Sequence, residues 1–391
     1  MQGQYRPTQG AQRQQSNREL SIRPILTIAI IAVSIILAVS IIVSVIVMAY
    51  NGVFDDIADI FDKNNGGYVD GGGGDDRPSK PSSSNLSLPD TLGLPKVAPK
   101  KNYLSSKAAD AKAISGVTSE AAILVKLSGN VSIAEKNADI RVHPASMSKL
   151  MTLIVACEKI TDTNALLTVE KRMLDYKSKE DGSGTSYLEL GDQICVEDAL
   201  YLISYRSDTV CCLMIAEYVA GSEKEFVKLM NEKAAALGLN GTHFANATGL
   251  YEDKTNGSNT DYTYTTCREM AAIMNCAMSN DAVRSIITST SKSFMVYQDG
   301  KRYGKFSESS KWFSYGERFA GNSQITNNIK VIAGKTGGED IPSSCFVTAA
   351  RTSDGEMYIC VVVGRINESG TKVGEKQSTD DTKHIYKNYI N

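Results

Sequence analysis

Apolar residues along this chain recur with two periods, one typical of strands and one of helices. "AAILVKL" and "VSIAEKN", separated by "SGN", predict a β-hairpin soon after residue 115. "SCFVTAA" and "MYICVVVG", joined by "RTSDGE", predict a second hairpin near residue 355, and "NNIKVIAGKTGG" precedes it as a further strand and loop. Strands are therefore expected at both ends of the region from about residue 115 to 365.

Helical spacing fills the sequence between these strands. Helices are predicted for "PASMSKLMTLIVACEKI", "VEDALYLI", "DTVCCLMIAEYVA", "SEKEFVKLMNEKAAALGL" and "TTCREMAAIMNCAM", with "TDDTKHIYKNYI" following the second hairpin. Strands at both ends with helices between and after them predict an α+β fold. In such a fold the helices pack on a mostly antiparallel sheet whose first and last strands meet.

Residues 25–49 form an uncharged apolar run, "ILTIAIIAVSIILAVSIIVSVIVMA". At about 1.5 Å per residue a helix of this length reaches roughly 37 Å, enough to cross a hydrocarbon layer of about 30 Å. The apolar part of a cleaved signal peptide is shorter, about 7–15 residues. We therefore predict a retained transmembrane helix that binds the chain to the membrane.

Charges flanking this run predict its orientation. Arginines at positions 6, 13, 18 and 23 precede it, and aspartates at 55, 56, 59 and 62 follow it. The positive-inside rule then places residues 1–24 in the cytoplasm and the rest of the chain outside, as a single-pass protein of the cell membrane. Residues 50–104 include "GGGGDDRPSKPSSSN" and "LPDTLGLPKVAPKK", which are too rich in Gly, Pro and Ser for a packed core. We interpret them as a flexible stalk and residues 105–391 as the folded domain.

Composition limits the classes of function. A formal net charge of -2, without a basic patch containing aromatic residues, gives no sign of a nucleic-acid partner. His143, His243 and His384 lack metal-ligand spacing, so no metal site is predicted. The eight cysteines form no Cys-x-x-Cys pair and mostly lie in apolar runs, which predicts buried thiols, with a disulfide as the alternative.

The stretch "HPASMSKLMT" carries candidate chemistry at the start of an apolar helix. Ser146 and Lys149 are three residues apart, so on a helix their side chains can meet. Near the helix start, unpaired backbone N–H groups favour a developing alkoxide. Ser-x-x-Lys is a weak signal alone, since it recurs at 289/292 and 369/372, but those copies lie in polar segments.

Two further motifs strengthen the interpretation of Ser146 and Lys149 as catalytic residues. "YRSDTV" contains Ser207 and Thr209, and "AGKTGG" contains Lys335 and Thr336 in the single Lys-Thr-Gly of the chain. Ser-x-x-Lys, Ser-Asp-Thr and Lys-Thr-Gly occur in the order found in penicillin-interacting serine enzymes, with the middle motif altered. Three motifs in this order are a strong signal.

Residues 115–365 resemble the D-alanyl-D-alanine carboxypeptidases, low-molecular-weight penicillin-binding proteins of the β-lactamase/transpeptidase superfamily. "KNADIRVHPASMSKLMT" and "AEYVAGSEKEFVKLMNEKAAALGLNGTHFANATGL" are also similar to that family around its first and second motifs. The resemblance implies a β-lactamase/transpeptidase-like fold, with a five-stranded sheet, flanking helices and a helical cluster. It also implies removal of the terminal D-alanine from peptidoglycan stem peptides, covalent inhibition by β-lactam antibiotics, and no cofactor.

The resemblance also implies the role of each motif residue. Ser146 would be the acylated nucleophile, and Lys149 would accept its proton as a neutral amine. Ser207 would relay protons to the leaving group. Lys335 and Thr336 would hold the terminal carboxylate of the substrate, and the backbone N–H groups of Ser146 and Gly338 would form the oxyanion hole.

Thr209 departs from the family, because asparagine usually ends the middle motif. A threonine hydroxyl is shorter than the asparagine amide, so we expect weaker positioning of the substrate rather than loss of acylation. Restoring asparagine at this position should raise turnover.

Three other functions share these motifs. A class A β-lactamase also needs a Glu-x-x-Leu-Asn loop, and "EFVKLMN" fails that spacing within a predicted helix. A DD-endopeptidase stays open, because the same residues can cut D-Ala–D-linked cross-links. A catalytically weak wall-binding module also stays open because of Thr209.

Overall fold

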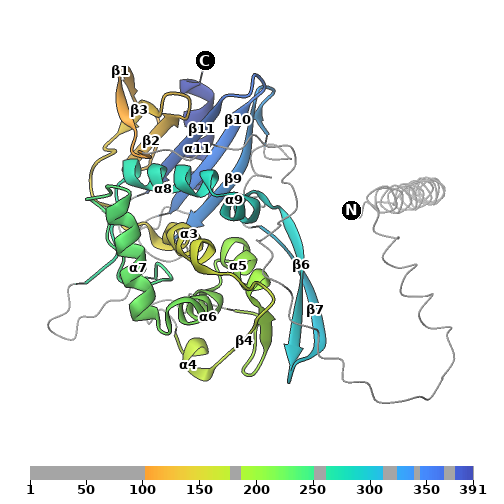
Figure 1. Ribbon diagram of the computed structural model, residues 1–391. Coiled ribbons are helices and arrows are strands. Elements are labelled where there is room, and N and C mark those ends of the chain that lie inside the picture. Colours follow the sequence, from red (N-terminus) through yellow and green to blue (C-terminus); the bar gives the residue numbers. More distant parts are fainter. Residues whose placement is uncertain are drawn as a thin grey trace, which may run out of the picture. The chain divides into compact units, whose positions relative to one another are not determined.

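The computed structural model describes residues 102–176, 186–250, 261–310, 324–338, 344–364 and 375–390. A seven-stranded sheet forms its centre, with strand order β1-β3-β2-β11-β10-β9-β8 (Figure 1). The strands are β1 Ser106–Ala113, β2 Ala121–Lys126, β3 Val131–Lys136, β8 Gln324–Thr326, β9 Ile329–Gly337, β10 Cys345–Thr352 and β11 Met357–Val363.

Both predicted hairpins are present in this sheet. β2 pairs with β3 and β10 pairs with β11, each in antiparallel register. β11 also pairs antiparallel with β2, so the first and last hairpins meet as expected. The α+β class and the mostly antiparallel sheet are therefore confirmed.

The predicted number of strands was wrong, because the sheet has seven strands rather than five. β1 is parallel to β3 at one edge, and its sequence "SKAADAKA" is exposed along most of its length. Such a strand has no apolar alternation to reveal it. β8, at the other edge, has only three residues, which is too short for a periodic pattern.

The central strands are apolar on both faces because helices cover both faces. On β2, Ile123 and Val125 face one core cluster while Ala122 and Leu124 face another. On β11 the side chains alternate in the same way. Strands buried on both sides have near-continuous apolar sequences, which explains runs such as "MYICVVV".

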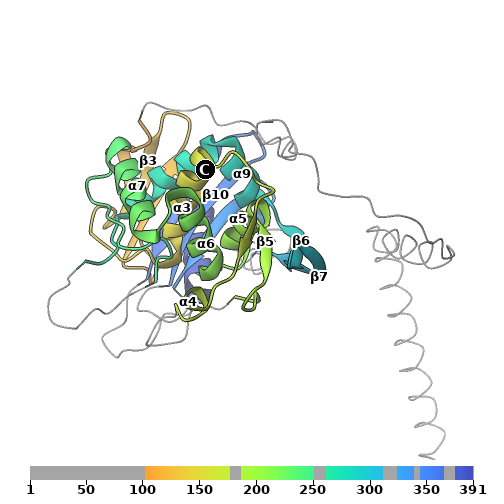
Figure 2. The same cartoon turned by 60° about the horizontal axis from the view of Figure 1, so that its bottom comes forward.

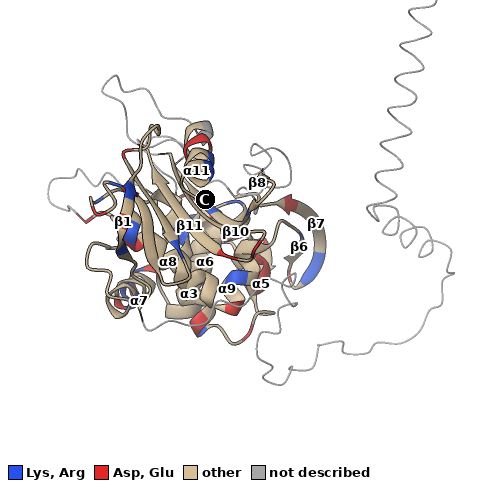
Figure 3. Ribbon diagram, turned by 90° about the horizontal axis from the view of Figure 1, so that it is seen from above, with Lys and Arg blue, Asp and Glu red and all other residues tan. Residues whose placement is uncertain are grey.

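Helices cover the sheet as Figure 3 shows, with α11 on one face and α8 and α3 on the other. The helices are the 3-10 turn η1 Ala145–Ser148, α3 Lys149–Lys159, α4 Lys171–Leu174, α5 Val196–Tyr205, α6 Thr209–Ala220, α7 Glu223–Ala236, α8 Cys267–Ser279, α9 Asp281–Thr288 and α11 Glu375–Tyr389. Each segment predicted to be helical contains one of these helices. The helical cluster is built from α3, α5, α6 and α7.

A second, four-stranded sheet lies beside this cluster (Figure 2). Its order is β4-β5-β6-β7, with bounds β4 Leu166–Thr168, β5 Gln193–Cys195, β6 Ser291–Gln298 and β7 Lys301–Ser309. The sequence predicted strands and loops here but not a separate sheet. β4 and β5 have three residues each, and β5 pairs with β6 through Gln193 and Tyr297, which are more than a hundred residues apart in the chain.

The predicted tail, transmembrane helix and nearly all of the stalk lie outside the described residues. Among the helices that the structure does describe, none combines the length and apolar character needed to span a bilayer. All eight cysteines fall within the described ranges as thiols without disulfides, and six of them are buried. The prediction of buried thiols is thus confirmed for those six.

Candidate active site

The first motif forms a tight turn at the start of α3. Ser146 lies in η1 and Lys149 is the first residue of α3. Side chains three residues apart are eclipsed in a 3-10 turn, which brings the two together. The Lys149 amine donates a hydrogen bond of 3.0 Å to the Ser146 hydroxyl. Lys149 is completely buried, whereas Ser146 is partly exposed, so the hydroxyl can be reached from solvent.

The backbone before Ser146 is held in a costly conformation. Ala145 has a φ of 47°, in the left-handed region that side chains other than glycine rarely adopt. The Ala145 N–H donates to Nδ1 of His143 at 3.2 Å, which fixes this turn. Burial lowers the pKa of His143 to about 4, so the imidazole is neutral at neutral pH and Nδ1 can accept.

A loop at residues 245–250 provides a second partner for the buried amine. Lys149 also donates to the backbone carbonyl oxygen of Thr248. Asn246 shapes this loop, since its Oδ1 accepts from the N–H groups of Thr248 and Gly249 and its Nδ2 donates to the Leu250 carbonyl. Sequence reasoning missed Thr248, because a backbone carbonyl leaves no signal in side-chain chemistry.

Gly249 allows this loop to approach the turn Ala145–Ser148, which carries the candidate nucleophile Ser146 and is called the nucleophile turn below. Its φ is +72°, and an added Cβ would lie 2.2 Å from the carbonyl oxygen of Ala145. The contact is with backbone, which cannot move aside as a flexible side chain would. The close approach therefore requires glycine.

Replacing Gly249 with alanine is expected to lower the free energy of unfolding by about 3 kcal/mol or more and to slow acylation, because the loop must move away from Ala145. Gly221 is the matched control, with a φ of +76° and nothing within 4 Å of an added Cβ. Gly221→Ala should lower the free energy of unfolding by only about 1–2 kcal/mol, the cost of the left-handed backbone conformation for alanine, and should leave acylation unchanged. Thermal melts and penicillin-labelling rates measure both effects, and equal losses in the two variants would contradict the steric explanation.

The second and third motifs meet through one hydrogen bond. Lys335 on β9 donates to the Ser207 hydroxyl at 3.0 Å, and its amine also donates to the Thr336 carbonyl at 2.9 Å. Ser207 lies between α5 and α6 with a φ of 61°. Lys335 is 1% exposed, so a second buried amine accompanies Lys149.

β9 also packs directly against the nucleophile turn. A Cβ added to Gly337 would lie 2.8 Å from the Pro144 carbonyl oxygen and 3.2 Å from the Met147 nitrogen. Gly338 follows with a φ of 77° and is partly exposed. The end of β9 is therefore brought beside Ser146, and residues from all three motifs surround one site.

Thr209 is the exception among the predicted site residues. It is the first residue of α6, it is completely buried, and its hydroxyl has no hydrogen-bond partner among the described residues. Its neighbour Asp208 caps α6 by accepting from the Cys211 N–H, and it also accepts from the Ser186 hydroxyl at 2.7 Å. Burial raises the pKa of Asp208, and these hydrogen bonds oppose the shift.

Replacing Thr209 with valine, which keeps the shape and removes the hydroxyl, is expected to raise the free energy of unfolding by about 1 kcal/mol, since a buried hydroxyl without a partner is unfavourable. Acylation by a fluorescent penicillin should stay within twofold of the original rate. A tenfold slower acylation would show instead that this hydroxyl contacts the substrate.

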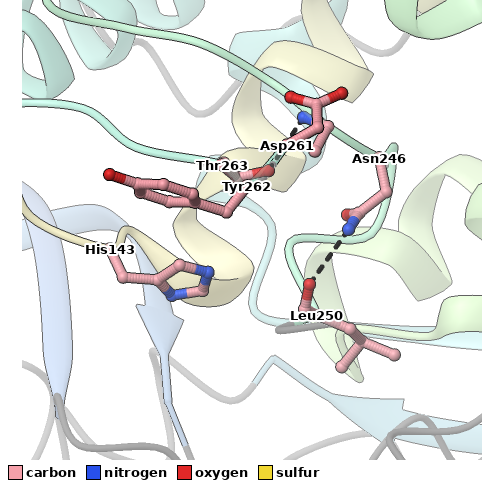
Figure 4. Close-up of a pocket in the computed structure, with 7 residues that line it drawn as sticks. His143, Asn246, Leu250, Asp261, Tyr262 and Thr263 are labelled. Atoms are coloured by element: carbon pink, nitrogen blue, oxygen red, sulfur yellow. Dashed lines mark hydrogen bonds between the residues drawn. The ribbon is translucent and has the colours of Figure 1, made fainter. Parts of the chain in front are cut away.

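A pocket lies next to the nucleophile turn, between the His143 segment and the 245–250 loop (Figure 4). Its lining consists of His143, Ala245, Asn246, Leu250, Asp261, Tyr262 and Thr263. Several of its polar groups serve the loop itself, since Asn246 binds the Leu250 carbonyl and the Thr263 hydroxyl accepts from the Ala245 N–H. We interpret this pocket as a hollow on the outer side of the 245–250 loop, the loop that contacts Lys149.

Comparison with known proteins gives one family. The sequence model of the peptidase S11 family, described as D-alanyl-D-alanine carboxypeptidase, matches residues 106–367. D-alanyl-D-alanine carboxypeptidase DacF of Bacillus subtilis is 35% identical over 146 residues, which are 37% of each chain. DacA of Escherichia coli is 32% identical over 162 residues, covering 40% of this chain and 38% of the relative. These matches thus span well under half the length of the relatives.

Two further comparisons add detail. The D-alanyl-D-alanine endopeptidase of Escherichia coli is 33% identical over 135 residues, covering 34% of this chain and 42% of the relative. Among solved structures, a variant of the Streptomyces K15 DD-transpeptidase superposes with a TM-score of 0.58 at 21% identity, over 70% of this chain and 98% of that one. The β-lactamase/transpeptidase-like fold is therefore confirmed.

Proposed function

Because the chain belongs to the peptidase S11 family of D-alanyl-D-alanine carboxypeptidases, we propose that it removes the terminal D-alanine from peptidoglycan stem peptides through a serine acyl-enzyme. The observation that carries this proposal is the 3.0 Å hydrogen bond from the buried amine of Lys149 to the partly exposed hydroxyl of Ser146. A buried lysine beside a reachable serine is a nucleophile with its base.

The reaction has two halves. The Ser146 oxygen attacks the carbonyl carbon of the penultimate D-alanine while Lys149, as a neutral amine, accepts the hydroxyl proton. The C–N bond then breaks, the leaving amine of D-alanine takes a proton through Ser207, and an ester on Ser146 remains. Water hydrolyses that ester with the same base, which restores the serine and releases the shortened peptide.

Cationic and backbone groups position the substrate in this scheme. Lys335 and Thr336 bind the terminal carboxylate, and the N–H groups of Ser146 and Gly338 stabilise the oxyanion. The approach of Gly337 to Pro144 supports this arrangement, because it brings the end of β9 beside the nucleophile turn. An oxyanion-hole donor typically contributes about 3–4 kcal/mol to the transition state. β-Lactams would acylate Ser146 as covalent inhibitors.

The test uses full-length protein and a peptide ending in D-Ala–D-Ala. We expect stoichiometric labelling by a fluorescent penicillin and catalytic release of D-alanine. Labelling with no release from any peptide would favour a weak wall-binding module instead. The absence of both would contradict the proposal.

Endopeptidase activity is a second candidate, supported by the likeness to the Escherichia coli endopeptidase. A cross-linked muropeptide dimer separates the two activities. A carboxypeptidase leaves the dimer intact and shortens only free pentapeptide, whereas an endopeptidase yields monomers.

Membrane attachment is also part of the proposal and rests on the sequence of residues 25–49. This segment would anchor the protein in the cell membrane with the N-terminus in the cytoplasm and the catalytic domain outside. Full-length protein should pellet with membranes and resist carbonate extraction, and deletion of residues 25–49 should release it. Full-length protein in the soluble fraction would contradict the anchor.

A further inference from the structure

We propose that Tyr187 forms a subsite that binds an apolar group of the substrate beside Ser207. This inference rests on the proposed function and adds a residue that none of the three motifs contains. The ligand chemistry is an aliphatic or ring group next to the scissile bond, which a stem peptide or a β-lactam can both supply.

Two contacts place Tyr187 next to the catalytic centre. The Ser186 hydroxyl donates to Asp208 at 2.7 Å, and the Tyr187 ring lies over the Arg206 guanidinium at 3.8 Å from its centroid. Arg206 and Asp208 are the neighbours of Ser207 in the chain. Residues 186 and 187 must therefore run alongside Ser207, whose hydroxyl accepts the hydrogen bond from Lys335.

The ring is held in place without being covered. The Phe306 ring meets Tyr187 edge-on, with centroids 6.2 Å apart and planes at 85°. Arg206, whose guanidinium lies over the Tyr187 ring, is itself held by an ion pair with Glu308 at 3.2 Å. Tyr187 nevertheless remains 60% exposed. A rigid, exposed aromatic face loses little conformational entropy when a ligand packs on it.

Charge around the ring favours an apolar ligand at this point. Arg206, whose guanidinium lies over the Tyr187 ring, pairs with Glu308, so its charge is balanced within the protein. The buried amines of Lys335 and Lys149 face the hydroxyls of Ser207 and Ser146. Tyr187 therefore presents an apolar ring surface to a ligand, whereas Lys335 on β9 presents the positive charge that binds a carboxylate.

The experiment compares three full-length variants in single-turnover acylation by penicillins and in D-alanine release. Tyr187→Ala should lower the second-order acylation rate and raise KM for the peptide by about tenfold, with kcat changed by less than threefold. Tyr187→Phe keeps the ring and should restore the original values. In Tyr187→Ala, the acylation rate should fall less for a penicillin with a small side chain than for one with a bulky aromatic side chain.

Tyr303→Ala is the matched control, because Tyr303 is 56% exposed and its hydroxyl donates to Asp192 at the end of the same loop. This variant loosens the loop without removing the ring beside Ser207, and it should acylate at the original rate. Equal loss in Tyr187→Ala and Tyr303→Ala would overturn the subsite in favour of a general effect of the loop. Unchanged KM in Tyr187→Ala would also overturn it. If the original protein neither labels nor releases D-alanine, the proposed function itself fails.

Discussion

Replacing Ser146 with alanine is expected to abolish both labelling by a fluorescent penicillin and release of D-alanine. The other hydroxyl of the turn, that of Ser148, is buried and donates to the Ala145 carbonyl oxygen at 2.8 Å, so it should not replace the missing nucleophile. The protein should stay folded, because Ser146 is partly exposed and its hydroxyl takes part in the structure through the hydrogen bond from Lys149. Rates of release should fall by at least about a thousandfold, as in other enzymes that lose their nucleophile.

The chain contains its own control for this variant. Ser289 and Lys292 repeat the Ser-x-x-Lys spacing, but Ser289 accepts a hydrogen bond from Tyr205 and Lys292 pairs with Glu197 and Asp198. Ser289→Ala should therefore label like the original protein. Retained labelling in Ser146→Ala would mean that another residue is acylated and would overturn the assignment.

The two copies of this motif also show what the sequence could predict. The helical apolar pattern after Ser146 separated it from Ser289, and the structure places Ser289 at the end of α9 and Lys292 on β6. The third copy, at 369 and 372, lies outside the described residues. Hydrophobic periodicity succeeded here because α3 buries most of one long apolar segment, so its pattern is strong.

The features that sequence reasoning missed have no such pattern. β1 is mostly exposed, and the Thr248 carbonyl belongs to the backbone of an irregular loop. The complete burial of Thr209, with no partner for its hydroxyl among the described residues, was also not expected from the sequence. Its motif spacing placed it near the site, but motif spacing does not reveal how deeply the first residue of α6 is buried.

Replacing Lys149 with methionine is the second variant with a large expected effect. A side chain of similar length and no amine cannot accept the Ser146 proton, so acylation should slow by about 10²–10⁴-fold. The Thr248 carbonyl would also lose its hydrogen bond, which costs about 1–3 kcal/mol of folding free energy. Stopped-flow labelling with a fluorescent penicillin gives the rate, and a thermal melt confirms that the protein is folded.

Lys149→Arg then separates a base from a fixed positive charge. Arginine supplies a cation that can donate to both Ser146 and Thr248, and its guanidinium stays protonated at any ordinary pH, so it cannot accept the Ser146 proton. If Lys149 acts as the base, the arginine variant should be as slow as the methionine variant, and both residual rates should rise steadily with pH because hydroxide replaces the missing group. A rate for Lys149→Arg within tenfold of the original would show that charge alone is enough, and proton acceptance by the amine would have to be assigned to another group.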